Sequence, residues 1–232
     1  MKNNPPQLVD GFGRRVSYLR ISVTDRCDFR CVYCMAEDMT FVPRQEVLSL
    51  EELERVARVF VGLGVSKIRL SGGEPLVRNN IMSLVNNIGQ LEGLEEMALT
   101  SNASQLQRLA VPLKEAGIKR INISLDSLNP EKFRQITRTG DLQQVLNGID
   151  AAIAAGFEGI KINAVILKGR NEDEILDLAH FAQSKGVDIS YIEEMPLGLI
   201  DEHDRALSFC SSAEVREILE SHYQLQEVDD ST

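Results

Sequence analysis

The chain has 232 residues, of which 43% are hydrophobic and 26% are charged, and its formal net charge is −10. These values are typical of a soluble globular protein with one domain, or with one domain and a short extension. The negative charge argues against a general binder of nucleic acid or membrane surfaces, because both need a broad positive field. A local basic pocket for an anionic small molecule stays open. No segment has the apolar run of a membrane span or of a signal peptide, so we expect a cytoplasmic protein.

Short apolar runs alternate with amphipathic segments after an N-terminal arm at residues 1–11. Each run is rich in β-branched residues, as expected of parallel strands that are buried on both faces. The predicted strands occupy residues 18–24, 67–71, 96–101, 120–126, 159–167 and 187–195.

Start and stop signals flank the predicted helices. Ser49 with Glu52 predicts a capping box, and Asn129 followed by a proline predicts a cap and a first-turn proline. Asn171 with Glu174 is predicted to be a further cap. Glycines follow the predicted helices, at points where a left-handed residue ends the last turn. They are Gly64, Gly93, Gly117, Gly156 and Gly186.

Six strand–helix units in succession predict an α/β fold with a parallel sheet. A doubly wound sheet and a barrel both fit this pattern. A complete eight-unit barrel typically needs about 250 residues, so we expect residues 12–223 to form a partial (β/α)6 barrel of the TIM type with outer helices. Pro112 is expected to disrupt the helix after the third strand. Residues 224–232 are polar and predicted to be a disordered tail. Reactive groups are expected at the C-terminal ends of the strands.

Three of the four cysteines follow the first predicted strand in a C-x3-C-x2-C arrangement: Cys27, Cys31 and Cys34. In a reducing compartment such a cluster favours metal binding over disulfides. A 4Fe–4S cluster ordinarily takes four cysteines, so three would leave one iron open to a ligand. A structural zinc site would need a fourth ligand, and Cys210 and the three histidines are distant in sequence. A chance match is the other alternative.

The cysteine spacing resembles the signature of the radical S-adenosylmethionine (SAM) superfamily. The resemblance implies that SAM chelates the open iron and that an electron from the cluster cleaves SAM to a 5′-deoxyadenosyl radical. It also implies a SAM site. Tyr33 matches the family's aromatic residue before the last cysteine, and Gly73 belongs to a Gly-Gly-Glu-Pro tetrapeptide that resembles the family's SAM-binding segment. An ordinary strand-to-helix turn could have the same tetrapeptide. Ser124 lies near the end of the fourth predicted strand, and Met195 closes the sixth. Such residues more often make local hydrogen bonds, for a serine, or pack in the core, for a methionine.

Further motifs extend the resemblance from about residue 12 to residue 198. They lie at residues 18–27, 67–75, 120–127, 161–165 and 192–198. Together they resemble the GTP 3′,8-cyclases, lyases that perform the first step of molybdenum cofactor (molybdopterin) biosynthesis. The resemblance implies hydrogen abstraction from C3′ of GTP and attack of that carbon on C8 of guanine, giving (8S)-3′,8-cyclo-7,8-dihydroguanosine 5′-triphosphate.

The same resemblance implies that GTP contacts Arg20, Arg69, Thr100 and Lys161. Cationic donors suit a triphosphate, although Arg20 and Lys161 would otherwise be read as ordinary strand cations. No catalytic side chain is assigned beyond the cluster, because the cofactor carries the bond chemistry. An external electron donor is an expected partner, and nucleic acid and membrane are not. A homodimer is left open.

The sequence departs from this family in two respects. The family holds a second 4Fe–4S cluster, which binds guanine, on three cysteines of its C-terminal part, whereas only Cys210 follows Cys34 here. The family's C-terminal glycine pair is also missing. We expect a truncated chain rather than a natural short relative, with SAM cleavage but incomplete cyclisation. Residues 100–104 read Thr-Ser-Asn-Ala-Ser where the family usually has Thr-Thr-Asn-Gly, so the turn is expected to differ.

Two other functions fit the sequence. One is a radical SAM enzyme that modifies a peptide or another small molecule. The other is a non-catalytic cluster-binding protein on the same scaffold.

Overall fold

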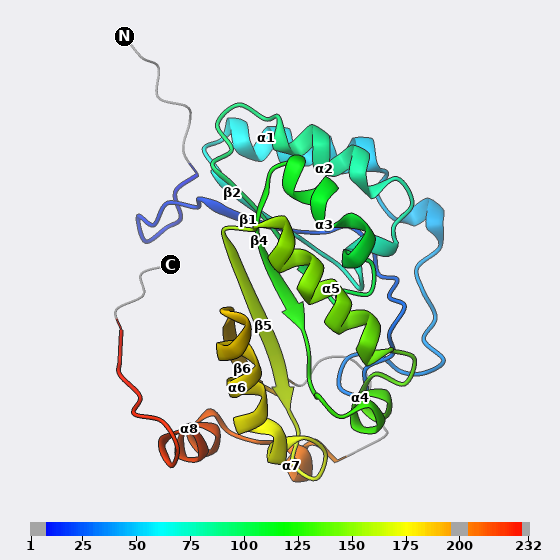
Figure 1. Ribbon diagram of the computed structural model, residues 1–232. Helices are drawn as coiled ribbons and strands as arrows, with labels where there is room; N and C mark the ends of the chain where they lie inside the picture. Colours follow the sequence, from blue (N-terminus) through cyan, green and yellow to red (C-terminus); the bar gives the residue numbers. More distant parts are fainter. Residues whose placement is uncertain (1–7, 196–203, 229–232) are drawn as a thin grey trace.

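The computed structural model describes residues 8–195 and 204–228. Six parallel strands form one sheet, and each strand pairs with the next one along the chain (Figure 1). A doubly wound sheet reverses its strand order at a switch point, and this sheet has no such reversal. It is the open, six-stranded part of a TIM-type barrel, as predicted. The strands are β1 (Tyr18–Ser22), β2 (Lys67–Ser71), β3 (Glu96–Ser101), β4 (Ile118–Ser124), β5 (Gly159–Ile166) and β6 (Asp188–Glu193).

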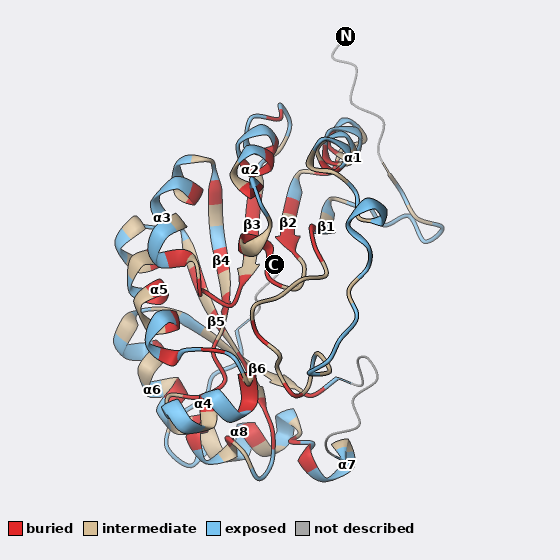
Figure 2. Ribbon diagram, turned by 90° about the vertical axis from the view of Figure 1, so that its right-hand side faces the viewer, coloured by how far each residue is buried: buried red, intermediate tan, exposed pale blue. Residues whose placement is uncertain are grey.

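The helices between the strands lie along the outer face of the sheet, where Figure 2 shows α1, α2, α3, α5 and α6 as an arc. The later helix α8 packs against α6 and β6. The helices are α1 (Leu50–Gly62), α2 (Ile81–Gly89), α3 (Leu106–Glu115), α4 (Pro130–Thr137), α5 (Leu142–Ala155), α6 (Ile175–Lys185), α7 (Arg205–Ser208) and α8 (Ser212–Glu220), with 3-10 turns η1 (Arg44–Glu46), η2 (Pro75–Val77) and η3 (Glu172–Glu174).

The two faces of the sheet differ in chemistry. On the outer face Ile68, Leu99 and Ile121 are at most 1% exposed and belong to one core with helix residues such as Leu84 and Leu113. The alternate residues point to the inner face, and many of them are polar or charged. The expectation that the strands are buried on both faces is therefore wrong for the inner face. A closed barrel fills its interior with branched apolar side chains, whereas this open sheet presents polar ones.

The predicted helix signals are mostly confirmed. The Ser49–Glu52 capping box caps α1, and Asn129 accepts hydrogen bonds from two backbone N–H groups at the start of α4. The five glycines that follow helices all have positive φ, between 67° and 99°. Asn171 stands at the N-cap position of η3, but its side chain makes no capping hydrogen bond. Its buried amide instead donates to the carbonyls of Asp126 and Val165.

The expected disruption at Pro112 is wrong. Helix α3 runs continuously from Leu106 to Glu115 with Pro112 on its exposed side. Leu106, Ala110 and Leu113 form its buried face, and their packing outweighs the proline penalty.

The predicted ends of the chain are partly described. Leu8 of the predicted arm bonds through its backbone to Leu63 and Val16. Residues 224–228 form no helix or strand, and residues 229–232 of the predicted tail lie outside the described residues. Residues 196–198 of the motif at 192–198 also lie outside them. The division into arm, barrel and tail stays a prediction.

Candidate active site

The three clustered cysteines lie on the loop between β1 and α1, at the C-terminal ends of the strands. Cys27 and Cys31 are half-buried, Cys34 is exposed, and all are free thiols. The Cys31 carbonyl accepts hydrogen bonds from the N–H groups of Cys34 and Met35, at 2.9 and 3.0 Å, which makes a tight turn. The Phe29 N–H points at the Cys27 Sγ at 3.3 Å. The predicted position of these residues is thus confirmed.

The electrostatics of the loop disfavour free thiolates. Burial raises the pKa of Cys27 to about 12, and the negative charges of Asp28, Glu74 and Cys34 add to the effect. Burial also raises the pKa of Cys31 and of Cys34. A bound cationic metal group reverses this balance, because a coordinating thiol is deprotonated.

The donor set fits a cluster better than a single ion. Within residues 8–195 and 204–228, no three Cys, His, Asp or Glu side chains are grouped closely enough for one metal ion. In a cubane each cysteine binds a different iron, so its ligands stand farther apart than those of zinc. Cys210 is only 2% exposed and lies near the charges of Lys168 and Glu214.

Two carboxylates anchor the cysteine loop to the sheet. Asp28 accepts hydrogen bonds from the Asn102 amide at 2.7 Å and the Ser104 hydroxyl at 2.6 Å, both after β3. Asp126, after β4, accepts from the Tyr33 hydroxyl at 2.7 Å, and its buried position raises its pKa to about 6. Sequence reasoning missed both roles. The signal available was a carboxylate at the end of a predicted strand and another beside the first cysteine.

The Gly-Gly-Glu-Pro tetrapeptide at residues 72–75 packs directly on the cysteine loop. A Cβ at Gly73 would collide with the carbonyl of Arg26, and the Gly73 N–H donates to the Thr24 carbonyl at 2.7 Å. The glycine is therefore required for close backbone approach within the protein, and its predicted contact with SAM stays a proposal. Glu74 is buried and accepts from the Asn102 N–H at 2.6 Å, while burial raises its pKa to about 7.

Of the other predicted SAM residues, Tyr33 lies on the cysteine loop, and Ser124 and Met195 lie at or just after the ends of strands. Tyr33 is held by Asp126, and Ser124 is the last residue of β4, half-buried opposite Asn163 of β5. Met195 follows β6 and is 54% exposed, so it is not a core residue.

The predicted GTP residues lie on the inner face of the sheet. Arg20 donates to the Ser71 hydroxyl at 3.0 Å, and Arg69 approaches the Thr100 hydroxyl at 3.4 Å. Arg69 and Lys161 both line a cavity of about 440 Å³ toward the N-terminal ends of the strands. The four predicted GTP residues therefore lie on one face of the sheet. The cavity lies toward the N-terminal ends of the strands, whereas the cysteine loop lies beyond their C-terminal ends.

Known proteins agree with this geometry. Residues 21–182 match the model of the Radical SAM superfamily. The whole chain is 65% identical to a GTP 3′,8-cyclase of Pseudomonas entomophila (strain L48) and 61% identical to one of Pseudomonas putida (strain W619), and covers 70% of each. A crystal structure of Streptococcus suis SuiB bound to S-adenosylmethionine matches 89% of this chain and 46% of that one, with a TM-score of 0.71 and 18% identity.

The chain belongs to the GTP 3′,8-cyclase family of the radical SAM superfamily. Its cofactors are accordingly a 4Fe–4S cluster and SAM, as predicted. The described residues contain no helix with the length and hydrophobicity to cross a membrane.

The family departure at residues 100–104 places an alanine in the left-handed conformation. Ala103 itself takes the positive φ, 64°, that a glycine would take there. Its methyl group is fully buried, and Gly148 of α5 makes room for it, because a Cβ at Gly148 would lie 3.1 Å from that of Ala103. The expectation of a different turn stays a prediction.

Proposed function

We propose that this chain is a radical SAM lyase of the reaction that converts GTP into (8S)-3′,8-cyclo-7,8-dihydroguanosine 5′-triphosphate in molybdenum cofactor biosynthesis, and that it cleaves SAM without completing the cyclisation. One observation carries the proposal. One sheet carries cations around a cavity toward the N-terminal ends of its strands and a loop of three cysteines beyond its first strand, in a chain 65% identical to a protein named GTP 3′,8-cyclase.

The cysteine loop is the proposed cofactor site. Cys27, Cys31 and Cys34 would hold the cluster, which supplies, with SAM, the 5′-deoxyadenosyl radical that takes hydrogen from GTP. Backbone and side-chain groups of Tyr33, Gly73, Ser124 and Met195 are proposed to contact SAM. Asp126 supports this arrangement, because its hydrogen bond with Tyr33 fixes the segment between two of the cysteines.

The inner face is the proposed GTP site. Arg20, Arg69, Thr100 and Lys161 would hold the nucleotide with its ribose toward the cysteine loop and its phosphates toward the N-terminal ends of the strands. Their donors can bind phosphate oxygens with charge-assisted hydrogen bonds. The open polar face has no side chain assigned as a general base, in keeping with radical chemistry.

The remaining partners follow from the reaction. Reductive cleavage of SAM consumes one electron, so an external electron donor is proposed, and the enzyme is proposed to act in the cytoplasm.

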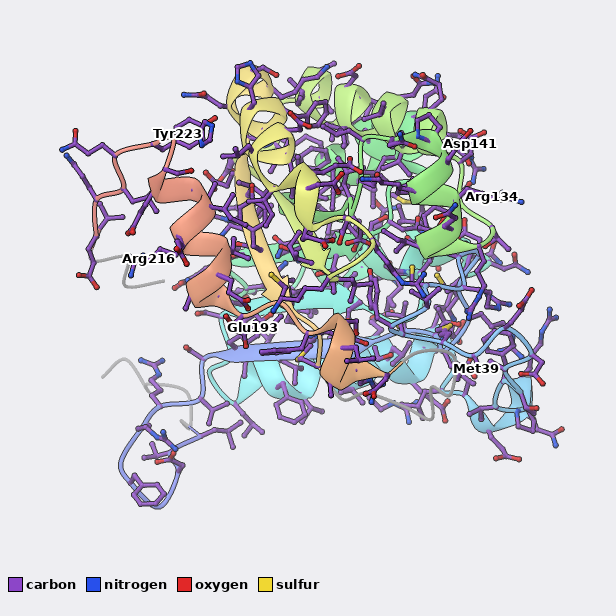
Figure 3. All side chains as sticks on the ribbon, turned by 90° about the horizontal axis from the view of Figure 1, so that it is seen from below. Met39, Arg134, Asp141, Glu193, Arg216 and Tyr223 are labelled. Carbon is purple, nitrogen blue, oxygen red and sulfur yellow. The ribbon has the colours of Figure 1, made fainter. Side chains whose placement is uncertain are left out.

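The direct test uses GTP carrying deuterium at C3′. Under anaerobic reducing conditions with SAM, the 5′-deoxyadenosine formed by the reconstituted chain should carry deuterium, as read by mass spectrometry. Arg69→Ala should lower the deuterium transfer, whereas Arg216→Ala on α8, outside the inner face (Figure 3), should not. Unlabelled 5′-deoxyadenosine would instead support a radical SAM enzyme with another substrate.

A further inference from the structure

A third arginine lies in line with the two predicted GTP arginines. The strand register places Arg20 beside Arg69, Arg69 beside Ala98, and Ala98 beside Arg120. The next partner in the same row, on β5, is Gly159. Three arginines therefore share one row across the inner face, and the positions next to Arg120 carry the smallest side chains.

The absence of a side chain at Gly159 leaves room for the Arg120 guanidinium. A Cβ built at Gly159 would lie 3.1 Å from Nε and 3.2 Å from Cζ of Arg120. These distances are tighter than ordinary contacts, so the guanidinium occupies the space that a side chain at position 159 would need. The missing side chain at position 159 thus sets where the Arg120 charge stands.

The charge of Arg120 is not neutralised by the described protein. Arg120, Lys67 and Lys161 line the same cavity of about 440 Å³ with Arg69. Glu96 and Asp188 also line it. Among residues 8–195 and 204–228, none of these four cations lies within 4.0 Å of a carboxylate oxygen.

The four cations lie around one cavity that also carries two acids, in a chain whose net charge is −10. Unpaired guanidinium and ammonium groups around one cavity are typical of a site for a multiply charged anion.

We propose that Arg120 binds the terminal phosphate of the nucleoside triphosphate and sets the preference for a triphosphate over shorter nucleotides. The inference rests on the proposed function and adds a specificity-determining residue to it. Arg120 lies one row, two residues or roughly 6.6 Å, nearer the N-terminal ends of the strands than Asn122 and Lys161. With the ribose at the cysteine loop, the last phosphate is the group that reaches this row.

The test compares binding of GTP, ATP, GMP and inorganic tripolyphosphate by calorimetry, using the full chain with its cluster reconstituted. Arg120→Ala removes the charge from an exposed side chain, so the fold should be kept. Gly159→Ala keeps the arginine but displaces its guanidinium. Arg216→Ala, on the outside of α8, is the matched control (Figure 3).

Arg120→Ala should weaken GTP binding about tenfold or more, the loss expected for one charge-assisted contact, and leave GMP binding nearly unchanged. Gly159→Ala should weaken GTP binding less and also spare GMP. Equal losses for GTP and GMP, or no loss for either, would overturn the assignment of Arg120 while leaving the proposed function intact.

The two proposals can fail separately. If GTP and tripolyphosphate binding both depend on Arg120 but GTP with deuterium at C3′ transfers none of it, the phosphate assignment holds and the GTP substrate fails. If the unmodified chain binds neither nucleotide triphosphate nor tripolyphosphate, both fail.

Discussion

Ala103 shows how one residue preserves a turn that usually uses glycine. It combines a positive φ with full burial against Gly148. Ala103→Gly removes about 1–2 kcal/mol of strain, because glycine adopts the left-handed conformation without cost. It also loses about 0.8 kcal/mol of methyl burial and about 0.5–1 kcal/mol through the greater entropy of the unfolded chain. We expect a change in unfolding free energy below about 1 kcal/mol.

Ala103→Val is the contrasting variant. A β-branched residue is an outlier at positive φ, and its added methyl groups have no room. We expect a loss of about 3 kcal/mol or more. Urea denaturation of both variants checks the pair, and a Val variant as stable as the Gly variant would refute the described turn.

The buried carboxyl group of Glu74 makes the unfolding free energy depend on pH. Its pKa is raised from 4.5 to about 7 by burial, so the folded state holds a proton that the unfolded state releases between those values. The unfolding free energy should therefore fall as pH rises from about 4.5 to about 7, by roughly 3 kcal/mol in total, and level off above.

The contribution of Glu74 is measured by urea denaturation of the original chain and of Glu74→Gln at several pH values across that range. The stability difference between them should change with pH below 7 and stay constant above it. Glu115→Gln, on the exposed side of α3, should track the original chain. A difference that is the same at every pH would contradict the protonated, buried carboxyl group.

At the scale of elements, α3 tolerates Pro112 because its buried face is unaffected. Proline in a helix interior costs about 3 kcal/mol relative to alanine, and part of this is offset by the stiffer unfolded chain. Pro112→Ala should raise the unfolding free energy by about 1–2 kcal/mol. Val111→Ala, at the neighbouring exposed position, should change it by less than about 0.7 kcal/mol. Thermal unfolding measures both, and a destabilised Pro112→Ala would show that the helix needs the proline.

The elements were largely predictable because their signals are local. Short apolar runs gave the six strands within two residues at each end in most cases, and Ser49, Asn129 and the five glycines marked helix ends. Asn171 was misread because its partners, the carbonyls of Asp126 and Val165, are brought to it only by the tertiary structure.

The site was predictable only where its residues are close together in the sequence. The cysteines are contiguous, whereas Arg20, Arg69, Thr100 and Lys161 could be grouped only through a family resemblance. Nothing in the local sequence shows that Asp28 and Asp126 anchor the cysteine loop, or that Arg120 rests on Gly159. Those contacts depend on strand register.

The whole molecule separates its charges. The overall charge is −10, yet the inner face gathers unpaired cations below the cysteine loop. The open sheet makes this separation practicable, because a closed barrel would fill the same space with apolar side chains. One sheet thus carries the proposed cluster site and the proposed polyanion site.

The most direct test of this account is the iron, sulfide and 5′-deoxyadenosine content of the chain after anaerobic reconstitution. With SAM and a reductant, the chain should hold about four iron and four sulfide ions and release 5′-deoxyadenosine. Serine variants of Cys27, Cys31 or Cys34 should lose both, and a serine variant of the buried Cys210 should keep both. Bound zinc in place of iron, or no 5′-deoxyadenosine from a chain with a full cluster, would contradict the account.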